Sequence, residues 1–207
     1  MKKVLAFAMA LAMVFSMAGC GNGSNSGSTN SGGDEVETLK IGVVCPISGV
    51  SAIAGKYITN GVEVVENELG GKIDIKGKEY NIEFIYMDNE ASEEKTTNVF
   101  QKLIEEEKVI AIVGPDMSKC ALAAGPIAQN AKCPVVTTFA TNTAVTEVGD
   151  YIFRACFIDP FQGQMAAQYI WESGYETASI MFNNADAYAT RSEEHTSELQ
   201  SLAYLVC

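Results

Sequence analysis

Histidine is almost absent from this chain, and its scarcity removes several kinds of catalysis. The 207 residues contain a single histidine, His195. Hydrolases built on a Ser-His or Cys-His pair need a histidine base beside their nucleophile, and His195 lies in a segment that continues no upstream pattern. The motifs G-x-S-x-G and H-E-x-x-H, the P-loop and a G-x-G-x-x-G after a strand are also missing. We therefore expect a protein that is not an enzyme and carries no cofactor.

Basic residues and metal-binding cysteine patterns are also scarce. The chain has 14 Lys and Arg against 26 Asp and Glu, a net charge of −12, which argues against a nucleic acid as partner because a phosphate backbone needs clustered cations. Four cysteines in the middle of the chain are widely spaced and form no C-x-x-C pair, so we predict no metal site. The four are Cys45, Cys120, Cys133 and Cys156. Cys45 and Cys133 lie in or beside apolar runs and are expected to be small buried hydrophobes.

No apolar run is long enough to span a membrane comfortably, yet the N-terminus has the features of an export signal. Two lysines precede the apolar run 4–15, which falls short of the about 20 residues that a span needs. The ending Met-Ala-Gly-Cys resembles a bacterial lipobox, so residues 1–20 are predicted to be a lipoprotein signal peptide with Cys20 lipidated; an ordinary signal peptide is the alternative. Residues 21–38, which begin with a Gly/Ser/Asn/Thr tract, are predicted to be a flexible linker. A diacyl group on Cys20 would supply the two chains that stable anchoring needs.

The remaining chain alternates between strand-like and helix-like patterns. Strands are predicted at 39–45, 80–87, 109–113, 134–137 and 178–182. Two helices are predicted from apolar residues at helical spacing, one with Ile58, Val62, Val65 and Leu69 and one with Val99, Leu103 and Ile104. Two further helices are predicted at 118–130 and 161–172. Strand-helix-strand repetition with helices on both faces predicts an α/β fold with a doubly wound parallel sheet.

Ligands of such sheets bind beyond the carboxyl ends of the strands. Ser118 starts a helix there, where free N–H groups and the helix dipole favour an anion. Thr138 to Thr141 supply backbone groups and hydroxyls on the neighbouring loop. From these residues alone, helix capping by Ser118 and turn formation by the threonines are the simpler explanation.

A series of motifs changes that balance. The string LKIGVVCPISG (39–49) with later Ala-Gly and Asn-Gly pairs, IVG before Ser118, PVV before Ala140 and Thr141, and the Asp-Ala-Tyr ending at Tyr188 follow one another in order. Together they resemble the Leu/Ile/Val-binding protein family, the solute-binding lipoproteins of ABC transporters with the type I periplasmic-binding-protein fold. The resemblance implies a first ligand-binding lobe over residues 39–152 and the start of a second lobe over residues 153–190.

The resemblance also implies a function. Ser118 and Thr141 would bind the α-carboxylate of an amino acid. Backbone groups from Phe139 through Ala140 to Thr141 would hold the carboxylate and the ammonium, and Tyr188 would approach from the second lobe. The protein would be an extracytoplasmic monomer, anchored to the cell membrane by lipid, that delivers a branched-chain or related amino acid to an ABC permease. Many members carry an aromatic residue where this chain has Ala54, so leucine specificity is not implied.

The last residues and the rival functions complete these expectations. Residues 191–207 resemble a translated sequencing adapter, so we interpret them as a non-native tail on a truncated chain that leaves apolar faces uncovered; a C-terminal helix is the alternative. One rival function is a same-fold receptor for another small ligand, such as an amide or urea, or a sensor. The other rival is a secreted hydrolase on a flavodoxin-like sheet.

Overall fold

A computed structural model of the chain describes residues 36–175 and 177–179, and it confirms the predicted α/β class. Six strands form one sheet in the order β2-β3-β1-β4-β5-β6. Every neighbouring pair is parallel except β2 with β3. The strands are β1 (Thr38–Cys45), β2 (Lys72–Ile75), β3 (Lys78–Asp88), β4 (Ala111–Val113), β5 (Val135–Thr137) and β6 (Ile152–Arg154).

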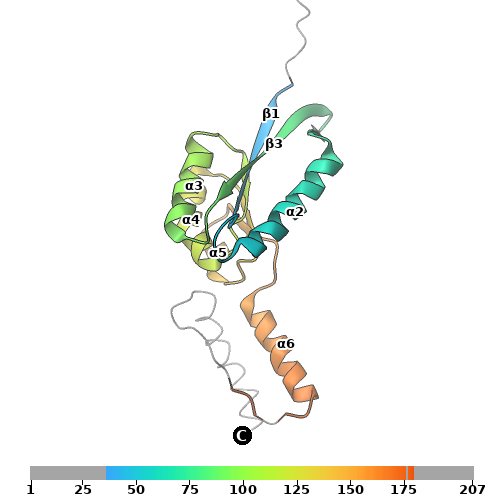
Figure 1. The fold of residues 1–207 in the computed structure, drawn as a ribbon, viewed down its shortest axis with the longest axis vertical. Coiled ribbons are helices and arrows are strands. Elements are labelled where there is room, and N and C mark those ends of the chain that lie inside the picture. Colours follow the sequence, from blue (N-terminus) through green and yellow to red (C-terminus); the bar gives the residue numbers. More distant parts are fainter. Residues whose placement is uncertain (1–35, 176, 180–207) are drawn as a thin grey trace, which may run out of the picture. The chain divides into compact units, whose positions relative to one another are not determined.

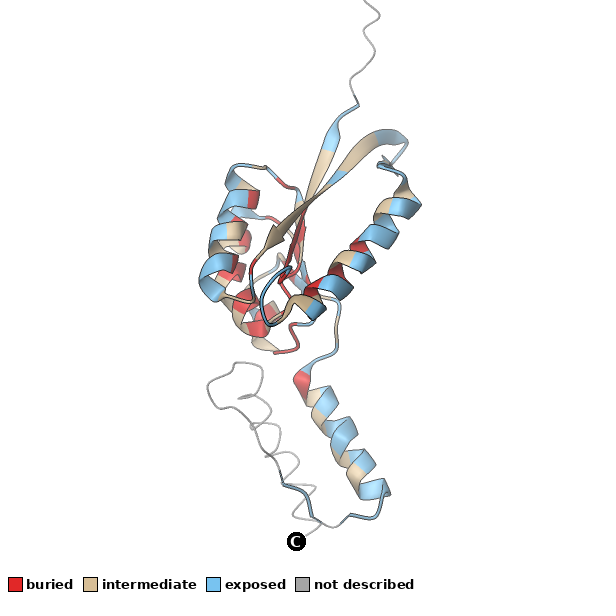
Figure 2. Cartoon of the chain, viewed as in Figure 1, coloured by how far each residue is buried: buried red, intermediate tan, exposed pale blue. Residues whose placement is uncertain are grey.

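Helices cover both faces of the sheet, as a doubly wound fold requires (Figure 1). Neighbouring residues of a strand point to opposite faces, so Val43 packs with residues of α2 while Val44 packs with residues of α3 and α4. Figure 2 shows buried residues on these helices where they face the sheet. The helices are α2 (Ala52–Leu69), α3 (Glu93–Glu105), α4 (Ser118–Ala131), α5 (Ala144–Glu147) and α6 (Asp159–Glu172).

The ends of the longer helices follow the sequence signals. Ser92 accepts a hydrogen bond from the backbone N–H of Lys95 at 3.4 Å and caps α3, as its position before two glutamates predicts. Gly70 ends α2 in the left-handed conformation and donates its N–H to the carbonyl of Glu66, the arrangement that favours glycine.

Several features differ from the sequence-based prediction, which placed no strand at β6 and no helix at α5. Strand β2 was not predicted; it pairs antiparallel with β3 through a tight turn at Lys76 and Gly77, both with positive φ. The side chain of Val65, which the helical period places on the same face as the buried Ile58 and Val62, is 43% exposed. Residue 153, at which the second lobe was expected to start, lies in β6, the last strand of this sheet; the second lobe stays a prediction. The predicted strand at 178–182 lies mostly outside the described residues.

The α2 face of the sheet is incompletely covered at its β5–β6 end by the described residues. Val136 is 39% exposed and Phe153 is 50% exposed, whereas their neighbours Val135 and Ile152 are buried against the α4 side. This alternation is what a strand shows when only one of its faces is packed. The described part of the chain therefore leaves an apolar strip open beside β5 and β6, as expected from the sequence.

Candidate functional site

The loops predicted to bind ligand lie together because the central strands are parallel. Cys45 at the end of β1 is paired with Asp88 at the end of β3, and Val113 at the end of β4 is paired with Val136 of β5. Chain segments that leave the strands at this carboxyl edge therefore emerge next to one another. They contain the loops after β1, β3, β4 and β5, where a ligand of a doubly wound sheet binds.

Ser118 joins two of these loops. It is the first residue of α4, and the residue in the N-cap position is Met117, whose side chain makes no capping hydrogen bond. The Ser118 hydroxyl instead accepts a hydrogen bond from the backbone N–H of Asn142 at 3.3 Å. The simpler explanation that Ser118 caps its helix is thus wrong. The start of α4 and the loop after β5 are held together at this hydroxyl.

Two buried hydroxyls on the loop after β5 lack a partner among the described residues. Thr141 is 6% exposed and Ala140 is fully buried. The Oγ1 atoms of Thr141 and Thr138 are buried and make no hydrogen bond with any described residue. Because a buried polar atom without a partner costs free energy, these hydroxyls are positions where a bound ligand or water would be stabilised. The predicted ligand-binding residues Ser118, Ala140 and Thr141 therefore lie close together.

Phe139 lies on the other side of the same loop. Its ring is about half exposed and helps to line a hollow of about 340 Å³ between α2 and the ends of the strands. Thr138 lines the same hollow, and the remaining residues are apolar or small: Tyr57, Ile58, Gly61, Val62, Val65, Phe84 and Val113. The exposed face of Val65 is explained by this hollow. The side chain of Phe139 therefore faces this hollow beside α2.

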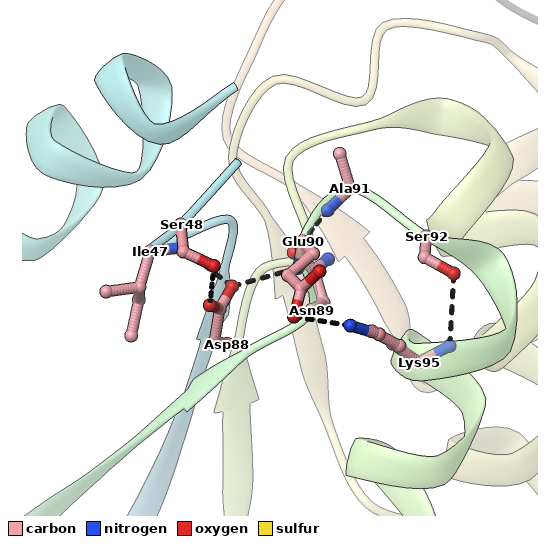
Figure 3. Close-up of polar contacts among 8 residues, drawn as sticks. All are labelled: Ile47, Ser48, Asp88, Asn89, Glu90, Ala91, Ser92 and Lys95. Atoms are coloured by element: carbon pink, nitrogen blue, oxygen red, sulfur yellow. Dashed lines mark hydrogen bonds and ion pairs between the residues drawn. The ribbon is translucent and has the colours of Figure 1, made fainter. Parts of the chain in front are cut away.

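Asp88 fixes the first loop of the site, the segment 46–51 after β1. Its carboxylate accepts hydrogen bonds from the Ile47 N–H at 2.9 Å, the Ser48 hydroxyl at 2.5 Å and the Glu90 N–H at 2.9 Å (Figure 3). Burial raises the pKa of Asp88, but these hydrogen bonds outweigh that effect and hold it below its usual value. A carboxylate with three donors is a rigid anchor, so the loop is held against the turn that precedes α3.

Asp116 is a buried carboxyl between β4 and α4. It is 4% exposed and its Oδ1 atom has no partner among the described residues. Burial raises the pKa of Asp116, although the backbone N–H groups of Asp116 and Met117 oppose the shift. Its charge in turn helps to raise the pKa of the buried Cys45 thiol to about 11, after burial itself. An acidic residue directly after a strand is usually a turn former or a polar ligand contact, so the burial of Asp116 is a feature that the structure adds to the site.

Arg154 holds the same loop from its far side and was not predicted as a site residue. Its guanidinium donates hydrogen bonds to the carbonyls of Ala140 at 3.0 Å, Asn142 at 2.9 Å and Thr143 at 3.1 Å, and to the Thr146 hydroxyl at 2.8 Å. No strand was predicted around Arg154 from the sequence. An arginine next to a strand end gives no indication of which loop it reaches.

Two predicted residues fall outside the described part of the chain, namely Tyr188 and the lipidation candidate Cys20. Within residues 36–175 and 177–179, no group of three or more histidine, cysteine or acidic side chains is placed to hold a metal ion. The same residues contain no helix with both the length and the apolar character that crossing a bilayer requires. Cys45, Cys120 and Cys133 are buried free thiols, which confirms the expectation for Cys45 and Cys133.

Comparison with known proteins identifies relatives of the whole described region. A sequence profile described as periplasmic binding protein matches residues 38–199. An amino acid binding protein of Pseudomonas aeruginosa is 29% identical over 131 residues, which are 63% of this chain and 34% of that protein. The chain thus spans about a third of the length of this curated relative.

Solved structures agree. The branched-chain amino acid transporter substrate-binding protein LivJ from Streptococcus pneumoniae, in complex with isoleucine, superposes with a TM-score of 0.71 at 30% identity, covering 78% of this chain and 46% of that one. A solute-binding protein of an ABC transporter from R. palustris, in complex with 4-hydroxybenzoate, gives a TM-score of 0.71 at 27% identity, covering 78% of this chain and 43% of that one.

These similar structures are solute-binding proteins, and they share the largely parallel sheet with helices on both faces that positions Ser118 and Thr141 here. Their family is extracytoplasmic. With its profile matched over 162 of 207 residues (38–199), this chain belongs to the periplasmic binding protein family and has the type I fold of its ABC-transporter solute-binding members.

Proposed function

We propose that this protein is the solute-binding component of an ABC importer and that it holds a branched-chain or related amino acid between two lobes. The observation that carries the proposal is the unpartnered, buried hydroxyl of Thr141 on the loop that Ser118 ties to the start of α4. In this reading the chemistry is binding without catalysis, and closure of the lobes on the ligand creates the form that docks on the permease.

The start of α4 suits the carboxylate of such a ligand. The helix has 14 residues with no acidic residue in its first turn, although the carboxyl of Asp116 lies just before its positive end. The Asp116 carboxylate lies beside the N–H groups of residues 116 and 117, so the ligand's contacts fall to Ser118 and Thr141. A hydroxyl readily donates a hydrogen bond to a carboxylate, and the Thr141 hydroxyl has no other partner among the described residues.

An aromatic carboxylate is the second candidate ligand. The relative solved with 4-hydroxybenzoate has the same TM-score as the one solved with isoleucine. Both ligands carry a carboxylate, and only the amino acid carries an ammonium. Ala54 stands at the start of α2, where many amino-acid-binding members carry an aromatic residue, and this leaves more room for the ligand's side chain.

Titration calorimetry on the purified product of the complete reading frame tests the proposal. L-leucine, L-isoleucine and 4-hydroxybenzoate are the probes, and micromolar or tighter binding of an amino acid is the expected result. Losing a hydrogen bond to a charged group costs about 1.5–3 kcal/mol, so Thr141→Val should weaken binding roughly 10- to 150-fold. Thr97→Val on α3, whose hydroxyl donates to the Glu94 carbonyl, is the matched control and should bind normally. Equal affinities for both variants would refute the assigned role of Thr141.

We further propose the remaining organisation. Residues 1–20 are a lipoprotein signal, Cys20 carries the anchor, residues 21–38 form the tether, and Tyr188 reaches the ligand from the second lobe. A Cys20→Ser variant should then appear in the culture medium or soluble periplasmic fraction, while the parent protein stays with membranes. Membrane retention of this variant would contradict the lipid anchor.

A further inference from the structure

Four consecutive carbonyl groups of the loop after β5 accept hydrogen bonds from one short segment, residues 154–159. The Arg154 guanidinium donates to Ala140 O, Asn142 O and Thr143 O at 2.9–3.1 Å. The remaining carbonyl, that of Thr141, accepts the backbone N–H of Asp159, the first residue of α6, at 3.2 Å. We call this set of contacts the clasp. It covers the whole stretch that contains the candidate ligand-binding residues Ala140 and Thr141.

The charge of Arg154 serves this loop. The salt bridges formed between described residues do not include Arg154, and all four of its hydrogen bonds go to residues 140–146. A guanidinium presents its donors in a rigid planar fork, so it can hold several acceptors in fixed directions at once, which a lysine ammonium cannot do. Hydrogen bonds with one charged partner are also stronger than neutral ones.

Peptide geometry connects the clasp with the ligand side of the loop. In a planar trans peptide the carbonyl and the following N–H point in opposite directions. The carbonyl of Thr141 faces α6, and the N–H of the same peptide, on Asn142, donates to the Ser118 hydroxyl. By the same rule, fixing the Ala140 carbonyl on Arg154 turns the Thr141 N–H away from Arg154. The clasp thereby orients the Asn142 N–H, the loop donor that reaches the start of α4.

We infer that Arg154 is a positioning residue for the ligand site, which acts through the loop and makes no ligand contact itself. The inference rests on the proposed function for its binding readout. It also implies that the loop and the beginning of α6 respond as one unit, because the Asp159 N–H is one of the donors. Ligand binding at Thr141 would therefore also affect the conformation of the chain segment that follows β6.

The test uses Arg154→Met and Arg154→Lys in the product of the complete reading frame. Phe100→Leu is the matched control, because this core residue of α3 can lower stability without removing any hydrogen bond of the clasp. The first readout is affinity for L-leucine, L-isoleucine and 4-hydroxybenzoate. The second is hydrogen–deuterium exchange of backbone amides 140–146, which needs no ligand.

Arg154→Met should weaken binding by about tenfold or more, since a loop that must first be ordered loses affinity, and amides 140–146 should exchange faster. Arg154→Lys should fall between Arg154→Met and the parent. Phe100→Leu should lower the melting temperature and leave affinity and loop exchange near parent values. The inference is overturned if Arg154→Met has the same ligand affinity and the same loop exchange as Phe100→Leu. If Arg154→Met does not fold, Arg154→Lys is compared with Phe100→Leu in the same two measurements. If the parent binds none of the probes, the proposed ligand class fails while amide exchange still decides the clasp.

Discussion

Replacing Gly55 by alanine probes the packing between α2 and the first loop of the site. Gly55 is buried in the first turns of α2. A Cβ atom there would lie 2.1 Å from the Pro46 carbonyl oxygen and 2.7 Å from its carbon. Both contacts are backbone atoms, so no rotamer change can relieve them. The helix or the loop must move by about 1 Å to restore van der Waals separation.

Gly61, on the same helix, is a matched control because a Cβ atom there meets nothing within 4 Å. Gly61→Ala should stabilise the protein by about 0.5–1 kcal/mol through helix propensity alone. Gly55→Ala gains the same term but overpacks two backbone segments at a cost near the upper end of 1–3 kcal/mol. We therefore expect a net loss of about 2 kcal/mol and a separation between the two variants of about 3 kcal/mol.

Urea denaturation followed by circular dichroism measures both values, with a constant slope m as the sign that only the folded state's stability changed. In thermal melts each kcal/mol should appear as about 2–4 °C. Gly55→Ala with a stability equal to or above that of Gly61→Ala would refute the reasoning, because it would mean that α2 does not approach Pro46 as closely as described.

Two carboxyl groups of the site should show pH effects of opposite sign. Burial raises the pKa of Asp116. The carboxyl therefore contributes its full stabilisation below its unfolded pKa of about 3.9 and loses it as the pH rises through the folded pKa. Asp116→Asn should equal the parent in free energy of unfolding near pH 3 and be more stable than the parent at pH 7, and a stability difference that is constant with pH would contradict this. The folded pKa of Asp88 is lowered, so its contribution is present above the unfolded pKa and lost as the pH falls through the folded pKa. Asp88→Asn should therefore be less stable than the parent at pH 7, and faster amide exchange at 47–51 should show the loosened loop; unchanged exchange would count against the anchor.

Local patterns predicted most of the elements because their signals lie within a few residues. The apolar run of β1, the Ser92 cap and the Gly70 stop each depend on neighbours in sequence, and each was confirmed. Strand β2 was missed because it has only four residues and its turn uses Lys-Gly in place of the stronger Asn-Gly or Asp-Gly signal. Val65 follows the helical period, but the period alone does not show where the sheet ends beneath a helix.

The candidate site was predictable only in part for a similar reason. Ser118, Ala140 and Thr141 follow strands, and parallel topology brings strand ends together. The role of Arg154 depends on a side chain that reaches loop residues 8 to 14 positions earlier in the chain, and the burial of Asp116 depends on the elements around it. Such contacts have no periodic signature in a single sequence. The motif series of the family, by contrast, indicated the relevant strand ends directly.

The β2–β3 hairpin offers a handle for surface immobilisation. Its turn at Lys76 and Gly77 is exposed and precedes β3, whereas the candidate site follows the opposite end of that strand, at Asp88. Insertions are best tolerated at exposed loop tips. A biotin-acceptor peptide placed in this turn would fasten the protein to a biosensor chip with its solute site facing the flow.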